Sequence, residues 1–138
     1  MSVLLILALV AGTLHLIWES LHIRLYTGYE KMEGRLPVVV YATLGDILYT
    51  FIAIGLVALF KGSFIWFLAA QAPDYLGLAI VGFFIALFVE YKAMALKRWE
   101  YTGKMPRFLG LGLTPLLQMT VLLPLSVSIA VEIARMML

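Results

Sequence analysis

Residues 3–25 read VLLILALVAGTLHLIWESLHIRL, an apolar run long enough, at 1.5 Å per residue, to cross the hydrocarbon core of a bilayer as a helix. Before Arg24 near its end, the run carries three titratable side chains, His15, Glu19 and His22, at spacings that place them on one helix face. Ionisable groups at membrane depth cost several kcal/mol unless they are paired or hydrated. This stripe therefore predicts a membrane span with a functional site inside it.

Three later runs have the same character, so we predict four spans, at Val3–Leu25, Pro37–Phe60, Tyr75–Leu96 and Phe108–Ala134. The connections between them are short and contain glycine and proline, which mark turns. Only 13% of the residues are charged and 64% are hydrophobic, whereas a soluble domain carries about 25% charged residues. The expected fold class is all-α: a polytopic membrane protein with a single domain, residues 1–138, built as an antiparallel bundle of four transmembrane helices.

Basic residues indicate the orientation of these spans. Eight of the ten lysines and arginines fall in or beside the first and third connections, and cytoplasmic connections are enriched in such residues. We therefore expect both termini on the non-cytoplasmic side. The first run has neither a basic segment before it nor a small-residue cleavage site after it, which favours a retained span over a signal peptide. The net charge of +2 does not indicate a nucleic acid partner, and the expected partner is the lipid bilayer.

Each later span also contains a polar residue: Asp46, then Glu90, then Gln118. Counted inward from the predicted cytoplasmic ends, these residues lie at one level with His15 and Glu19, roughly 9–15 Å deep at 1.5 Å per residue. Helices that each place a polar group at one level can bury these groups together, at a lower cost than burying each one separately against lipid. We therefore predict that His15, Glu19, Asp46 and Glu90 converge on one acid/base site.

Four neighbouring residues are expected to bind a substrate at this site. Tyr49 follows Asp46 by three residues and so shares its helix face. Tyr49 and Gln118 are expected at the rim of the cavity, and Trp18 and His22 adjoin the stripe on the first span.

The same residues also have structural interpretations. His22 can extend to the lipid headgroups, and the Gln118 amide can hydrogen-bond between helices. The carboxylates can form ion pairs on their own helices, which would join Glu19 to Arg24 and Glu90 to Lys97.

Aromatic residues near the ends of the spans are interpreted as interfacial belts. One group, at the end of the third span, is Trp99 and Tyr101; the other, for which a re-entrant segment is the alternative, is Phe64, Trp66, Phe67 and Tyr75. In the fourth span, Pro115 is expected to leave backbone carbonyl groups unpaired near the polar level.

No metal and no cofactor is expected. The chain contains no cysteine, so thiolate ligands are excluded. A metal bound by His15, Glu19 and His22 would take all three ligands from one helix, and Asp46 would have to complete its coordination. Because both histidines lie on one helix, they cannot clamp a haem between two helices of a monomer.

Two short segments resemble a known family of membrane enzymes. The segment His15-Leu16-Ile17-Trp18-Glu19, followed by Leu25-Tyr26 and Tyr29-Glu30, is similar to the intramembrane His-Leu-x-x-Glu helix of the emopamil-binding-protein type of sterol isomerase. The segment Gly45-Asp46-Ile47-Leu48-Tyr49 is similar to a Gly-Asp-x-Leu-Tyr segment of that family. The resemblance implies acid/base roles for the histidine and the first glutamate. The family also has a second acid/base glutamate on another helix. Glu90 can correspond to it by role but not by motif, because the order of the helices along the chain differs.

These observations favour a cofactor-independent membrane enzyme that acts on a lipid-soluble, isoprenoid- or sterol-like substrate, of the isomerase or cyclase type. A buried carboxyl group that holds a proton and a nearby histidine suit such chemistry. Two alternatives stay open. The same residues are compatible with a proton-coupled or cation transporter, for which a homo-oligomer would enclose the path, and the chain could equally be a membrane-anchor subunit of a larger complex.

Overall fold

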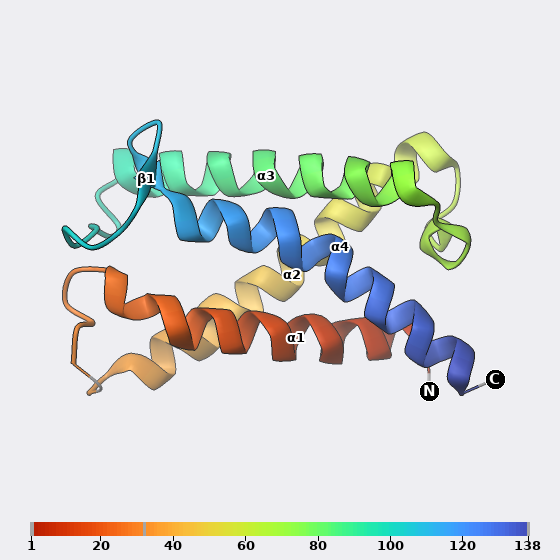
Figure 1. Ribbon diagram of the computed structural model, residues 1–138, viewed down its shortest axis with the longest axis horizontal. Helices are drawn as coiled ribbons and strands as arrows, with labels where there is room; N and C mark the ends of the chain where they lie inside the picture. The colour runs from red at the N-terminus through yellow and green to blue at the C-terminus, as the bar shows by residue number, and fades with distance from the viewer. Residues whose placement is uncertain (1, 32, 138) are drawn as a thin grey trace.

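The computed structural model describes residues 2–31 and 33–137. Its four long helices are α1 (Val3–His22), α2 (Arg35–Lys61), α3 (Ala72–Ala95) and α4 (Leu113–Met136) (Figure 1). Two 3₁₀ helices, η1 (Ile23–Leu25) and η2 (Trp66–Ala69), and a two-stranded hairpin of β1 (Arg107–Phe108) and β2 (Leu111–Gly112) complete the described elements. All four long helices are long and apolar enough to cross a membrane. The predicted all-α bundle of four spanning helices is confirmed.

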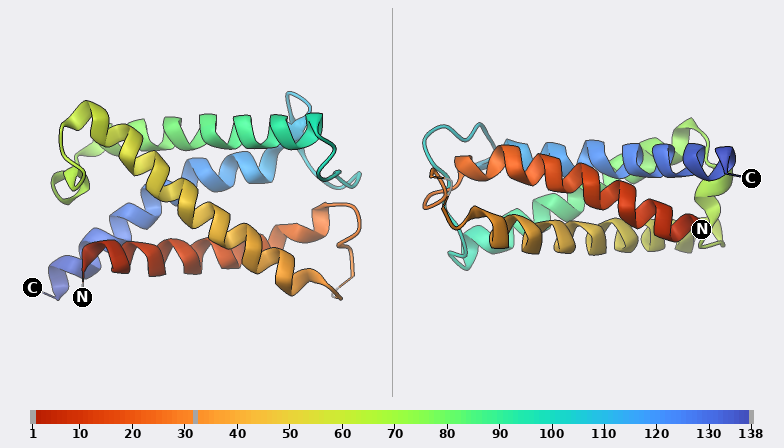
Figure 2. Two further views of the ribbon diagram at one scale, coloured as in Figure 1. Left: turned by 180° about the vertical axis from the view of Figure 1, so that it is seen from behind. Right: turned by 90° about the horizontal axis from the view of Figure 1, so that it is seen from below.

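The helices alternate in direction, so that both termini lie at one end of the bundle (Figures 1 and 2). The opposite end carries the first and third connections, and we refer to it as the basic end. Helices α1 and α3 run along opposite sides and α4 lies between them, while α2 crosses them diagonally, behind in Figure 1 and in front in the left view of Figure 2. Half of the apolar stretch of α4 is buried inside the bundle, against 17% of that of α3. Helix α4 is therefore the element on which the core is built.

Glycine makes room for close contacts between helices at two positions in this core. At Gly82 on α3, an added Cβ would lie 2.5 Å from the Met119 carbonyl oxygen of α4. At Gly12 on α1, it would lie 3.2 Å from Cδ1 of Ile47 on α2. Small residues let the backbones of membrane helices approach each other, which increases their van der Waals contact.

The start of the fourth helix differs from the predicted one. Residues 107–112 form the β1–β2 hairpin instead of a helix, and its turn places Leu109 and Gly110 at positive φ values of 52° and 80°. Helix α4 then begins at Leu113, so Pro115 lies in its first turn. An N–H in the first turn has no partner within the helix, and proline therefore removes no hydrogen bond there. The expectation that Pro115 would leave carbonyl groups unpaired is wrong.

The second connection is packed into the protein. Trp66 and Phe67 in η2 are only 5% and 1% exposed, and the Trp66 indole nitrogen donates to the Ile54 carbonyl oxygen at 3.1 Å. For these two residues the interfacial-belt interpretation is wrong, since they close the core instead of facing the interface. Phe64, in contrast, is exposed.

At the basic end, the two connections are joined to one another. The Thr27 amide donates to the Glu100 carbonyl oxygen at 2.9 Å, and the Thr102 amide donates to the Leu25 carbonyl oxygen at 2.8 Å. Between these bonds, Tyr26 and Tyr101 form an isolated antiparallel bridge. The bridge holds the two tyrosines side by side over the ends of α1 and α3.

We predict that Gly82→Ala destabilises the bundle. The new methyl group would meet backbone atoms of α4, which cannot rotate away, and overpacking of this kind costs about 1–3 kcal/mol. The matched control is Gly77→Ala on the same helix, where nothing lies within 4 Å of the added carbon. Thermal unfolding in detergent should show a lower midpoint for Gly82→Ala alone, and equal midpoints for both variants would contradict the close α3–α4 approach.

Candidate acid-base site

The side-chain amide of Gln118 lies at the centre of a buried polar cluster formed by α1, α2 and α4. Its Nε2 atom is 2.9 Å from Oε1 of Glu19, 2.8 Å from Oδ2 of Asp46 and 3.0 Å from Nδ1 of His15. We refer to these four residues as the Gln118 cluster. The sequence places Gln118 at the rim, and this is wrong: it is 2% exposed and contacts the other three residues directly.

The Gln118 cluster holds protons on the amide and on His15, within reach of two carboxyl groups. The amide nitrogen carries two hydrogens, which Oε1 of Glu19 and Oδ2 of Asp46 accept. With the amide reversed, its oxygen would face two carboxyl groups, so the orientation that donates is favoured. His15 Nδ1 lies 3.4 Å from Oδ2 of Asp46, and the tautomer with its hydrogen on Nδ1 donates to that carboxyl group. A proton can therefore pass between His15 and Asp46 without leaving the cluster.

His22 extends the Gln118 cluster toward the basic end. Its Nε2 lies 3.0 Å from Oε2 of Glu19, and its Nδ1 lies 3.0 Å from Oγ1 of Thr114. His22 is buried, so it does not reach for the headgroups. Glu19 is bonded to His22 and Gln118, and not to Arg24, as the ion-pair alternative required.

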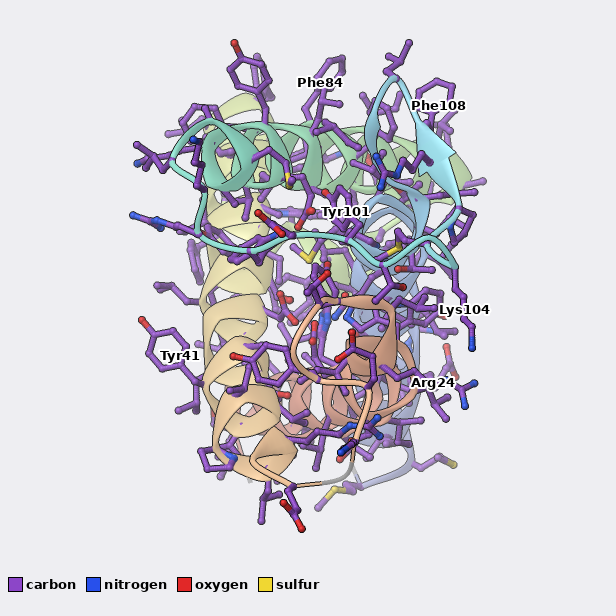
Figure 3. All side chains as sticks on the ribbon, turned by 90° about the vertical axis from the view of Figure 1, so that its left-hand side faces the viewer. Arg24, Tyr41, Phe84, Tyr101, Lys104 and Phe108 are labelled. Atoms are coloured by element: carbon purple, nitrogen blue, oxygen red, sulfur yellow. The ribbon has the colours of Figure 1, made fainter. Side chains whose placement is uncertain are left out.

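Glu90 belongs to a second cluster, which we refer to as the Glu90 cluster. Its Oε2 accepts hydrogen bonds from the Tyr101 hydroxyl and, at 3.3 Å, from the Trp99 indole nitrogen. The belt interpretation of Trp99 and Tyr101 is therefore wrong, as is the pairing of Glu90 with Lys97. Burial and the hydrogen bond to Glu90 raise the pKa of Tyr101, so its hydroxyl stays protonated and donates. Figure 3 shows Tyr101 in the middle of the basic end.

Glycine makes room for this tyrosine. At Gly112, the residue before α4, an added Cβ would lie 2.9 Å from Cε1 of Tyr101. The hairpin that the sequence does not reveal thus also positions the donor to Glu90.

Tyr26 lies between the two clusters. Its ring is in edge contact with His22 at 5.5 Å and with Trp99 at 6.1 Å, and it is tilted against Tyr101 at 5.6 Å. Burial and the carboxylates of Glu90 and Glu19 raise the pKa of Tyr26. The phenol therefore stays neutral and separates two acidic groups at the basic end.

Of the four residues predicted to converge on one site, His15, Glu19 and Asp46 do lie together, in the Gln118 cluster. Within the described residues, Glu90 makes no hydrogen bond to them and approaches them through Tyr26. Trp18 is partly buried, and its indole nitrogen has no partner among the described residues. The sequence did not predict that Trp99 and Tyr101 hydrogen-bond to Glu90, or that Thr114 hydrogen-bonds to His22. These partners lie in connections or at helix ends, far along the chain from the residues they contact.

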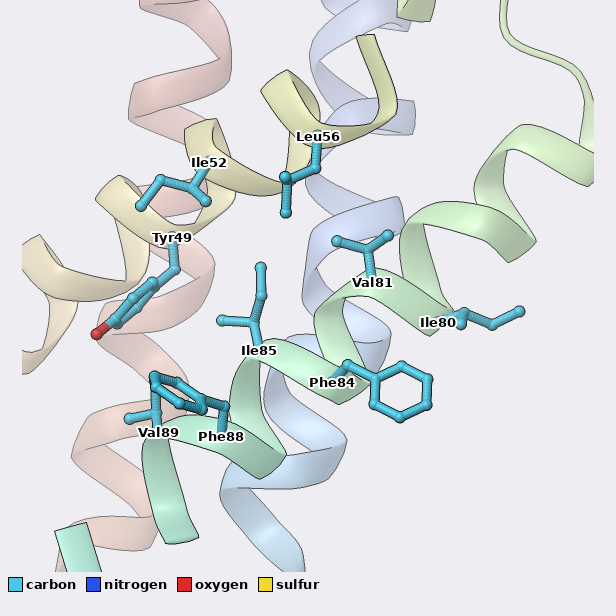
Figure 4. A pocket seen from close by; sticks show the side chains of 9 residues that line it. All are labelled: Tyr49, Ile52, Leu56, Ile80, Val81, Phe84, Ile85, Phe88 and Val89. Carbon is cyan, nitrogen blue, oxygen red and sulfur yellow. The ribbon is translucent and has the colours of Figure 1, made fainter. Parts of the chain in front are cut away.

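Tyr49 lines an apolar groove between α2 and α3 with a volume of about 420 Å³. Tyr49, Phe88 and Val89 lie near one end of the groove, toward the basic end, and Leu56 and Val81 lie near the other (Figure 4). The remaining lining residues are Ile52, Ile80, Phe84 and Ile85. The groove exists because α2 crosses α3 diagonally and diverges from it toward the basic end (Figure 2).

We predict that Gln118→Leu lowers the stability of the protein by about 1–3 kcal/mol, because two buried carboxyl groups lose their shared donor. The matched control is Thr120→Val on the same helix. The Thr120 hydroxyl donates at 2.7 Å only to the Leu116 carbonyl oxygen of its own helix. Thermal unfolding in detergent measures both variants, and a Gln118→Leu midpoint no lower than that of Thr120→Val would show that the amide does not hold the cluster together.

In the described ranges, no group of three histidine, aspartate or glutamate side chains has the arrangement needed to hold a metal ion. Compared with known proteins, the chain matches no family model, no curated protein and no solved structure. Any inference about function therefore rests on the geometry of the Gln118 cluster, the Glu90 cluster and the groove.

Proposed function

We propose that this protein is a cofactor-independent membrane enzyme that transfers protons to and from a lipid-soluble substrate, in a reaction of the isomerase or cyclase type. The observation that carries the proposal is the Gln118 cluster. It buries two carboxyl groups and an imidazole around one amide, so groups that give and take protons lie within hydrogen-bond reach of one another.

The reaction needs one group that gives a proton and one that takes a proton. A carboxylic acid protonates one carbon of an alkene, which leaves a carbocation at the other alkene carbon. A carboxylate or imidazole then removes a proton from the saturated carbon on the far side of this cation, so that the double bond moves by one position. Protons and electrons balance within the substrate, and no oxidant or reductant is required. Positioned acid and base groups contribute about 10²–10⁴-fold each to such a rate.

Asp46 is the member of the Gln118 cluster best placed to meet a substrate. Its side chain is 16% exposed, against 11% for Glu19, whereas that of His15 is fully buried. His15 can exchange a proton with Asp46, and Gln118 orients both of these residues and Glu19. Glu90, with Tyr101 as its donor, supplies the second acid/base group. The resemblance to the sterol isomerase family supports the same roles for His15 and Glu19.

An apolar outer half favours an enzyme over a transporter. On the side of His15 nearer the termini, the buried side chains are mainly aliphatic, among them Leu7, Ala53, Ile54, Leu123 and Val127. An ion path would need polar groups or water along this part of the bundle. Among the described residues, the buried titratable side chains lie in the half near the basic end, and the other half adds only hydroxyl groups such as those of Thr50 and Ser126.

For the orientation, we propose that the basic end faces the cytoplasm and that both termini lie on the other side. The support is the charge distribution, with eight of ten basic residues at or beside the basic end.

We predict that Glu19→Gln and Glu90→Gln each lower turnover by about 10²–10⁴-fold, because an amide keeps the shape of the carboxyl group but cannot transfer its proton. Turnover is measured as deuterium incorporation from D₂O into a panel of unsaturated neutral lipids. Glu132→Gln is the control, since Glu132 is exposed and paired with Arg135. If the two variants chiefly lose thermal stability while activity per folded molecule is unchanged, the carboxylates are structural.

Single-cysteine labelling tests the orientation. The chain has no native cysteine, so Glu33→Cys and Gly103→Cys introduce unique thiols in the first and third connections, and Ser63→Cys does so in the second. In intact cells, a membrane-impermeant maleimide should label only Ser63→Cys. Labelling of the other two sites from outside would reverse the proposed orientation and leave the helix count untouched.

A further inference from the structure

The groove between α2 and α3 is lined at one end by Tyr49, three residues along α2 from Asp46 of the Gln118 cluster. We propose that it binds the chain of a neutral, single-chain lipid, with a hydroxyl or carbonyl group at the end marked by Tyr49. This inference rests on the proposed function and specifies the substrate class.

The dimensions of the groove fit one hydrocarbon chain. From Ile80 to Val89 it runs for about 14 Å along α3 at 1.5 Å per residue. Its volume is about 420 Å³, within the range of about 300–1,000 Å³ for small-molecule sites. The groove is thus long and apolar, a shape that suits an extended hydrocarbon chain laid along α3.

One end of the groove is polar. Tyr49 is the only lining residue with a polar side chain, and no hydrogen bond satisfies its hydroxyl within the described part of the chain. On α2, Tyr49 lies about 60° around the helix from Asp46 at 100° per residue. Asp46 is the most exposed member of the Gln118 cluster, with 16% of its side chain exposed against 11% for Glu19. A polar group that lies at this end thus meets the Tyr49 hydroxyl, one helical turn or less from a buried acidic cluster.

Charge decides which polar group fits. Glu19, Asp46 and Glu90 bring three carboxyl groups to this level, and the only side chains paired with them by charge in the described residues are His15 and His22. An anionic headgroup would add a further negative charge to a buried acidic region, at a high cost in free energy. A hydroxyl or carbonyl group adds none and can hydrogen-bond to Tyr49.

A phospholipid chain is the competing occupant. The Lys92 ammonium lies 5.9 Å from the centre of the Phe88 ring, at the end of the groove nearest the basic end, where it could pair with a phosphate. In that arrangement the headgroup would stay at the interface, and only a chain would enter the groove.

The experiment uses the full chain in phosphatidylcholine nanodiscs with a hexadecanol probe that carries a diazirine in its chain. Irradiation should label α2 and α3 at the groove, and excess hexadecanol should reduce the labelling at least tenfold, whereas hexadecyl phosphate should not. Ile52→Trp should reduce it at least fivefold because it fills the groove. Leu48→Trp is the matched control, since Leu48 is one turn away on α2, similarly exposed, and outside the groove.

Two results would overturn the inference. Equal labelling of the groove by a diazirine phosphatidylcholine, with no displacement by hexadecanol, would show that bulk lipid fills it. Displacement by hexadecyl phosphate that is lost in Lys92→Gln would show an anionic ligand. Glu19→Gln separates the two proposals, because it should abolish deuterium incorporation and retain the labelling. If the wild-type groove is labelled but no deuterium is incorporated into any lipid, the enzymatic function is rejected, whereas the lipid-binding site in the groove is supported.

Discussion

The cost of placing carboxyl groups inside a membrane governs this structure, and the Gln118 amide is what offsets it. Glu19 and Asp46 come from different helices, and each would be expensive to bury alone. A single amide from a third helix donates to both, at 2.9 and 2.8 Å. The polar contacts thereby fix the rotations of α1, α2 and α4 about their axes. Apolar packing in lipid is less selective, since a leucine pairs nearly as well with a lipid tail as with another helix.

The remaining helix is positioned by different means. Helix α3 contributes no group to the Gln118 cluster; it approaches α4 at Gly82 and is joined to α1 through the connections at the basic end. Two backbone hydrogen bonds and the Tyr26–Tyr101 bridge make this joint. Since Glu90 receives its donors from the same connection, the joint also sets the distance between the two acidic groups.

Much of the architecture could be read from the sequence, because membrane spans follow from the length of apolar runs. The shared depth of the polar residues also followed, since rise per residue is fixed in a helix. The contacts made by the connections between the helices could not be predicted from the sequence. The sequence around Trp66, Trp99 and Tyr101 is the same as that of aromatic residues in an interfacial belt. Only their partners show that they are buried, and these partners lie on other segments of the chain. The β1–β2 hairpin was hidden for a similar reason, since residues 108–113 are apolar enough to continue a span.

The order of the helices along the chain has a consequence for biosynthesis. A polypeptide enters the membrane from its N-terminus as it is made. Glu19 and Asp46 therefore arrive with the first two helices, while Gln118 is still some seventy residues away in the sequence. During that interval, an aspartate near the centre of a helix carries an insertion penalty of about 2.5–3.5 kcal/mol. Until α4 arrives, the two acids have only the histidines of α1 as partners, and a chain terminated before α4 never receives the amide that both of them accept from.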